Sequence, residues 1–152
     1  MERAKIVGEI EIGEIRMKET EKEIRNIPEF KKKVEKSLTA SVTELLEIIF
    51  AGVIILEGSD LHLEPEENQV KLRIRIDGVL HDAMSLNLKT YQDILSRIKL
   101  LSGLKLNIVD RPQDGRFTIA CRMLNISDGG TPAISVAGFF QPTNQKAVSL
   151  VV

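Results

Sequence analysis

The first residues with chemical potential form an acid–histidine–acid row. Asp60, His62 and Glu64 alternate with Leu61 and Leu63, so the three polar side chains would share one face of a strand. Such a row can orient a general base or bind a cation. No nucleophile or pocket-forming motif stands beside it in the sequence. A structural hydrogen-bond network is therefore the favoured interpretation.

A basic row follows a few residues later. Lys71, Arg73 and Arg75 alternate with apolar residues between Val70 and Ile76, which predicts a half-buried strand with a basic outer face. Arginine forks suit phosphate or carboxylate groups. The alternative is a solvated strand face that binds nothing. We keep Arg73 and Arg75 as candidate residues for binding an anion, a nucleotide or a partner.

Motifs of established enzyme classes are missing from the sequence. There is no phosphate-binding G-x-x-x-x-G-K-[ST] or G-x-G-x-x-G, no H-E-x-x-H and no G-x-S-x-G. Cys121 alternates with Phe117 and Ile119, so it is interpreted as a core thiol and not as a nucleophile. One cysteine and two histidines give a metal site little to build on. We therefore expect no catalytic residue, no metal and no cofactor.

Composition limits the remaining classes. The 152 residues are 43% hydrophobic, enough for one domain with a core. Lys and Arg number 21 against 22 Asp and Glu, and this balance argues against a nucleic-acid binder. The longest apolar run, Ile48 to Leu56, is far shorter than the roughly 20 residues that span a bilayer, so we expect no membrane insertion. A single cysteine favours a reducing, cytoplasmic setting.

The first 37 residues are expected to form a charged arm, followed by a domain over residues 38–152. Alternation around Ile10 and Ile12 predicts a short strand, and Glu19 to Lys36 has a helical pattern interrupted by Pro28. The run Lys31 to Lys33 could bind anions. A solvated helix face is the favoured interpretation, because glutamates flank the run.

The elements that must position the two rows are mostly hairpin-linked strands. A helix capped by Ser41 or Thr43 should end near Gly58, and Asp77-Gly78 suits a two-residue hairpin turn. A helix should also precede Gly103. The other expected segments are strands over 60–64, 70–76, 79–84, 117–123, 133–141 and 146–152, and a loop over 111–116. This pattern predicts an α+β domain.

Four motifs, in this order and spacing, resemble the type II secretion and type IV pilus assembly ATPases. They are Ser59-Asp60-Leu61-His62-Leu63-Glu64-Pro65, Arg73-Ile74-Arg75-Ile76-Asp77-Gly78-Val79-Leu80, Ser96-Arg97-Ile98-Lys99 and Pro112-Gln113-Asp114-Gly115-Arg116. The resemblance covers about residues 40–117. It makes Asp60, His62, Glu64, Asp77, Gly78, Gln113, Asp114, Gly115 and Arg116 residues of a structural motif.

The resemblance implies a fold and a role. In that family this stretch is the domain immediately before the ATPase domain, a PAS-like two-layer module with a mostly antiparallel sheet and packed helices. It implies docking on a neighbouring subunit's ATPase domain within a hexamer. It also implies that the arginines matching Arg73 and Arg75 face the bound nucleotide.

The sequence departs from the family pattern after the fourth motif. Ala137 and Leu150 stand where the family has arginines, and Asp110 stands where an arginine often precedes the P-Q-D-G-R motif. No Walker motif and no zinc-binding cysteine pair is present.

Three functions remain open from the sequence. The chain could be a non-catalytic domain that docks on a secretion or pilus ATPase, or on another protein, with self-association possible. It could be a PAS-like sensor of a nucleotide or another small anion. It could also be a fragment of a longer ATPase, although the missing arginines count against an active parent. The first is preferred, and the charge-poor last third of the sequence could add docking surface.

Overall fold

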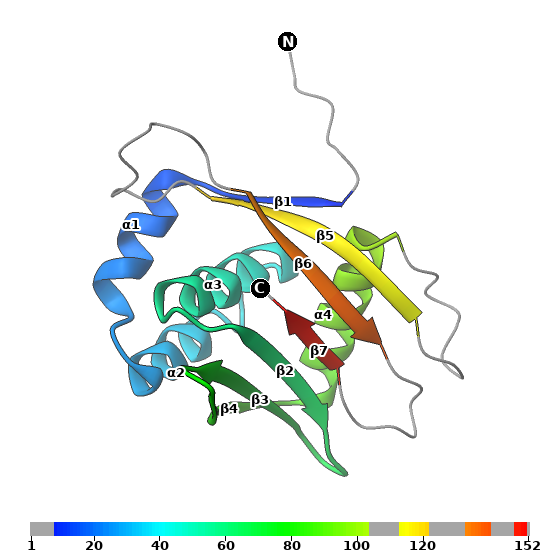
Figure 1. The fold of residues 1–152 in the computed structure, drawn as a ribbon. Helices are drawn as coiled ribbons and strands as arrows, with labels where there is room; N and C mark the ends of the chain where they lie inside the picture. Colours follow the sequence, from blue (N-terminus) through cyan, green and yellow to red (C-terminus); the bar gives the residue numbers. More distant parts are fainter. Residues whose placement is uncertain (1–7, 104–112, 122–132, 141–147, 152) are drawn as a thin grey trace.

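In a computed structural model of the chain, the described residues are 8–103, 113–121, 133–140 and 148–151 (Figure 1). The helices within these ranges are α1 (Glu14–Glu23), α2 (Ile27–Lys36), α3 (Val42–Ile55) and α4 (Leu88–Leu101). The strands are β1 (Glu9–Ile12), β2 (Asp60–Pro65), β3 (Val70–Ile76), β4 (Val79–Leu86), β5 (Gln113–Cys121), β6 (Ala133–Phe140) and β7 (Val148–Val151). The predicted α+β class is confirmed, and the described ranges contain one helix more than the sequence suggested.

All the described strands belong to one sheet, in the order β1-β5-β6-β7-β2-β3-β4. β1 pairs with β5 in parallel, and every other neighbouring pair is antiparallel. The expectation of a mostly antiparallel sheet is therefore confirmed. β7, the last strand in the chain, lies between β6 and β2 and joins the two halves of the sheet.

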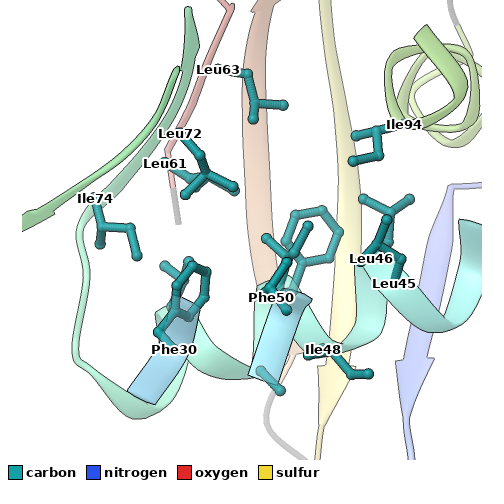
Figure 2. Close-up of a cluster of buried hydrophobic side chains, with 14 of the residues drawn as sticks. Phe30, Leu45, Leu46, Ile48, Phe50, Leu61, Leu63, Leu72, Ile74 and Ile94 are labelled. Carbon is teal, nitrogen blue, oxygen red and sulfur yellow. The ribbon is translucent and has the colours of Figure 1, made fainter. Parts of the chain in front are cut away.

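Helix α3 lies at the centre of the core. Most of its sequence is apolar, and Leu45, Leu46 and residues 48–53 are buried, so only a small part of the helix faces solvent. Figure 2 shows Phe50 of α3 and Phe30 of α2 in the same interior as the apolar side chains of β2 and β3. The ring of Phe50 also packs against Phe117 of β5, with 5.6 Å between ring centroids. Both halves of the sheet therefore pack against the helices.

Side chains fix where three helices begin. The Ser41 hydroxyl accepts a hydrogen bond from the Glu44 amide at the start of α3, which confirms one of the two predicted caps. Asn26 and Asn87 cap α2 and α4 in the same way. The predicted interruption at Pro28 is wrong by a few residues. The break precedes Pro28, which lies in the first turn of α2, where its missing N–H costs no hydrogen bond.

The charged arm predicted over residues 1–37 contributes to the common core within its described part. Ile10 and Ile12 of β1 pair with Ile119 and Cys121 of β5 and are buried. Further buried side chains of this segment are Met17, Ile24, Phe30 and Val34. The boundary at residue 38 falls just after α2, but the core continues across it. Across the described ranges, no helix has the length and apolarity needed to cross a membrane.

Candidate functional site: the charged face of the β2–β4 sheet

The register of β2 and β3 brings the two polar rows of the sequence together. Asp60 lies opposite Arg75, His62 opposite Arg73, and Glu64 opposite Lys71. The intervening leucines and isoleucines point inward, so these polar side chains share the outer face. We call the following set the charged face: Asp60, His62, Glu64, Lys71, Arg73, Arg75 and Asp82 of β4.

Arg75 is tied to its own hairpin. Its Nε donates a hydrogen bond to Asp60 Oδ2 at 2.7 Å, and its Nη1 donates to the backbone carbonyl of Gly78 at 3.2 Å. These bonds link the first residue of β2, the end of β3 and the hairpin turn. Arg75 therefore fastens three parts of the local structure.

Arg73 contacts two carboxylates from different strands. Its Nε donates to Asp82 Oδ1 of β4 at 2.7 Å, and its Nη1 lies 3.6 Å from Glu64 Oε2 of β2. Lys71 Nζ lies 3.6 Å from the other oxygen of Asp82. The basic row is therefore not an unopposed cationic surface, because carboxylates of the same sheet face it.

His62 lies between the two acids of its own row. Its Nε2 is 3.9 Å from Asp60 Oδ2, and its Nδ1 is 3.7 Å from Glu64 Oε1. These distances exceed those of hydrogen bonds, so neither carboxylate holds the ring as an orienting acid holds a general base. Among the residues whose positions are described, no group of three or more His, Cys, Asp or Glu could hold a metal ion.

The turn at the end of the hairpin has the predicted conformation. Asp77 and Gly78 both have positive φ, at 51° and 79°, as a two-residue type I′ turn requires. The hairpin itself pairs Ile76 with Val79. The prediction of a hairpin with Arg73 and Arg75 on its outer face is confirmed, although β4 continues to Leu86.

The expected loop at the fourth motif is wrong for its described part. Gln113, Asp114, Gly115 and Arg116 begin β5 and pair with residues 137–140 of β6. Long antiparallel pairing with β6 outweighs the turn preference of the Asp-Gly dipeptide there. Asp110, Arg111 and Pro112 lie outside the described residues. Motif residues 113–116 are in another part of the sheet from the charged face, separated from β2 by β6 and β7.

Two positions at which the sequence departs from the family pattern lie on β6 and β7. Ala137 of β6 pairs with Arg116 of β5 and with Val151 of β7. Leu150 of β7 pairs with Leu61 of β2. Leu150 therefore neighbours the strand that carries the acid–histidine–acid row.

The third motif lies on α4, away from the charged face. Ile98 is fully buried, and desolvation by burial lowers the pKa of Lys99. Arg97 donates a hydrogen bond to the Thr43 hydroxyl of α3 at 2.8 Å. It lines a cavity of about 220 Å³ together with residues of β1 and α3. Sequence reasoning missed this cavity because its lining comes from three distant segments.

One member of that cavity is a partly buried carboxyl. Burial raises the pKa of Glu47, and the guanidinium of Arg16, with Nε 3.1 Å from the Glu47 carboxylate, acts in the opposite direction. Arg16 also donates to Glu44 at 3.2 Å. These contacts tie α1 to α3 and thereby help hold the arm segment in place.

The lysine run 31–33 and Cys121 agree with the interpretations favoured from the sequence, a solvated helix face and a core thiol. Lys31 and Lys33 lie near Glu35 and Glu23, at 3.8 Å and 2.9 Å, as expected of a solvated helix face. Cys121 is buried in the core, and burial raises the pKa of its thiol. A raised pKa leaves less thiolate at neutral pH, which argues against a nucleophile.

Comparisons with known proteins relate the chain to secretion and pilus ATPases. Residues 35–127 match the family described as "Type II/IV secretion system protein". The chain is 36% identical over 100 residues to the type IV pilus assembly ATPase PilB of Myxococcus xanthus, covering 66% of this chain and 17% of that protein. It is 40% identical over 82 residues to the type II secretion system protein E of Xanthomonas campestris, covering 53% and 14%.

The matches cover only a part of each relative, so the chain spans less than a fifth of the length of these two proteins. The family match includes the β2–β4 sheet, α4 and β5. It therefore contains the whole charged face and all four motifs. Because this match extends over more than half of its length, the chain belongs to the type II/IV secretion system protein family.

Proposed function

We propose that this chain is a non-catalytic docking domain that binds a type II secretion or type IV pilus ATPase through its charged face. The observation that carries the proposal is the half-buried arginine Arg73, whose guanidinium is held on the outer face of the sheet between carboxylates of two strands. Arginine in such a setting can exchange one carboxylate for another, because the fork geometry suits both. The occupant we propose is a set of acidic side chains on the ATPase.

The family relationship supports this partner. The relatives of the chain are named as pilus ATPases and secretion proteins, and the chain matches a short part of each.

Its sequence has no Walker A motif. Phosphoryl transfer depends on donors and a magnesium ligand placed around the phosphates. We therefore expect the purified chain not to hydrolyse ATP or GTP. Hydrolysis that stays with the protein through successive purification steps would contradict this. We also propose a cytoplasmic setting, which fits the lone buried thiol of Cys121.

The test is calorimetric binding to the purified ATPase encoded in the same genome. Replacing Arg73 and Arg75 together with alanine should weaken binding by about 2 kcal/mol or more, because charge-assisted contacts are the strong ones. It should also flatten the salt dependence of binding. The matched control is Arg25→Ala with Lys89→Ala, which removes two exposed, ion-paired cations elsewhere. Equal affinity of the double variant and the wild type would refute docking through this face.

The alternative function, a sensor of a nucleotide or another small anion, predicts a different result for the same purified proteins. A chain that binds ATP by itself should show a higher melting temperature with ATP, since binding to the folded state stabilises it by mass action. A docking domain should show that shift only in the presence of the ATPase. A shift with ATP alone, lost in the Arg73 and Arg75 variant, would favour the sensor.

A further inference from the structure

The two arginines of the charged face are held in different ways. Arg75 bonds to the Gly78 carbonyl of the hairpin turn and to Asp60 of β2, whose side chain is only 23% exposed. The shortest bond of Arg73 goes to Asp82, whose side chain is 60% exposed. Arg73 is thus held by the most exposed acid of the face, and Arg75 by the least exposed.

The register of the hairpin sets Asp82 in this position. Counted from the two-residue turn, Ile76 pairs with Val79 and Arg73 pairs with Asp82 without a shift. A β-bulge follows directly, because Leu72 pairs with Met84 and Ala83 is the extra residue in β4. β4 is an edge strand of the sheet, and its Asp82 carboxylate lies on the outer face opposite Arg73. One of its oxygens contacts Arg73 and the other lies near Lys71.

An incoming anion would need the same donors. Arg73 Nε and Lys71 Nζ are the groups that the Asp82 carboxylate uses, at 2.7 Å and 3.6 Å. Glu64, at 3.6 Å, is the other acid within reach of Arg73. A pair with an exposed partner is weak because water solvates that charge well, and the Asp82 side chain is 60% exposed. An external oxyanion can therefore replace Asp82 at a small cost.

We propose that Asp82 is a built-in competitor, which occupies Arg73 and Lys71 until an external oxyanion displaces it. Arg75, by contrast, is a positioning residue that fastens the hairpin. This inference rests on the proposed function, because it names the internal control of the same binding face. It makes Asp82 the residue that sets affinity, and it separates the roles of two arginines that look equivalent in sequence.

The experiment compares Asp82→Asn with Asp93→Asn. Both changes remove one exposed, ion-paired carboxylate, but Asp93 lies on α4 beside Lys89, outside the charged face. Affinity for the purified ATPase is measured by calorimetry without nucleotide. Asp82→Asn should tighten binding by about two- to fivefold, the range that exposed ion pairs contribute. Asp93→Asn should leave affinity unchanged. An effect of net charge alone would instead change affinity equally in the two variants.

A second arm separates this inference from the proposed function. Inorganic pyrophosphate is titrated into each variant and followed by NMR of the Arg73 side chain. Asp82→Asn should again bind more tightly than Asp93→Asn. If the wild type does not bind the ATPase, the proposed docking is refuted, and the pyrophosphate comparison alone decides whether Asp82 competes. Tightening only with the ATPase indicates acidic side chains as the displacing group, and tightening only with pyrophosphate indicates phosphate.

The overturning results are specific. If Asp82→Asn binds both probes no more tightly than Asp93→Asn, Asp82 is not a competitor, even where Arg73→Ala still weakens docking. The separation of roles is tested with single variants. Arg75→Ala should lower the melting temperature more than Arg73→Ala, while Arg73→Ala should lose more affinity. The reverse order would overturn the assignment of Arg75 as the positioning residue.

Discussion

At the scale of single residues, many charged side chains in the described part of the chain form ion pairs with one another. On the charged face, each arginine has a carboxylate of the same sheet 2.7 Å from its Nε. The apolar interior depends on close fits of a different kind. Gly52 of α3 allows the ring of Phe30 to approach the helix backbone, because a Cβ at this position would lie 2.5 Å from the ring.

We expect Gly52→Ala to lower the free energy of unfolding by about 1 kcal/mol or more. Overpacking in a filled core costs about 1–3 kcal/mol, and the helix propensity of alanine recovers up to about 1 kcal/mol. Phe30 is fully buried, so its ring has little room to move. Urea denaturation measures the change. Gly13→Ala is the control, since a Cβ there meets nothing within 4 Å. In a Phe30→Leu background the same glycine change should cost less.

Tyr91 gives a pH-dependent prediction. Burial raises the pKa of its hydroxyl to about 12 from the ordinary 10.0. The unfolded chain releases this proton near the ordinary value, whereas the folded chain keeps it to higher pH. The contribution of Tyr91 to stability is therefore complete below about pH 10 and is lost as pH rises toward 12. Tyr91→Phe should show a shallower loss of stability there.

The ionisation of Tyr91 can be followed directly, because it is the single tyrosine of the chain. Near-UV absorbance of the phenolate should titrate close to the raised value in the folded protein and near the ordinary value in urea. Identical midpoints in the two conditions would show that burial does not perturb this group.

At the scale of elements, helix starts and the hairpin turn are set locally. Three helices begin at a Ser or Asn whose side chain accepts a hydrogen bond from a backbone amide three residues ahead. The β3–β4 hairpin turns through two residues with positive φ. The order of strands, in contrast, depends on distant pairings, such as β1 with β5 and β7 with β2.

We expect Gly78→Ala to lower the free energy of unfolding by about 1–2 kcal/mol. The φ of Gly78 is 79°, a conformation in which a Cβ is strained. Open space surrounds the position, so the cost is conformational and not a clash. Asp77→Asn is the control, because asparagine tolerates positive φ and should change stability little. Chemical denaturation of the two variants provides the comparison, and equal stabilities would argue against a strained turn.

At the scale of the whole molecule, residues 8–37 cannot be separated from the other described residues without opening the core. Met17, Ile24, Phe30 and Val34 are buried against a centre that α3 supplies. β1 adds a strand to the edge of the sheet beside β5. Charged side chains cover the outside of residues 8–37, and most of the large apolar side chains there are buried, with Ile15 exposed as an exception.

A chain that begins at residue 38 should therefore lack a cooperative thermal unfolding transition. It exposes the faces of α3 that α1 and α2 cover, and each lost large apolar side chain costs about 2–5 kcal/mol. Calorimetry and near-UV circular dichroism measure this. A chain that begins at Gly8 retains every described residue and should unfold cooperatively. Cooperative unfolding of the shorter chain would instead support an independent domain from residue 38.

The sequence alone determined the features that depend on neighbours along the chain. Period-two alternation places Arg73 and Arg75 on one face, Asp77-Gly78 turns the hairpin, and Ser41 caps α3. Tertiary structure decided the features that depend on long-range pairing. The sequence could not show that Leu72 would pair with Met84 instead of Ala83, because a bulge at Ala83 shifts the register beyond the Arg73–Asp82 pair. Likewise, pairing with β6 drew Gln113–Arg116 into a strand against the local turn preference. Such outcomes follow from summed contacts between distant segments, which no local pattern encodes.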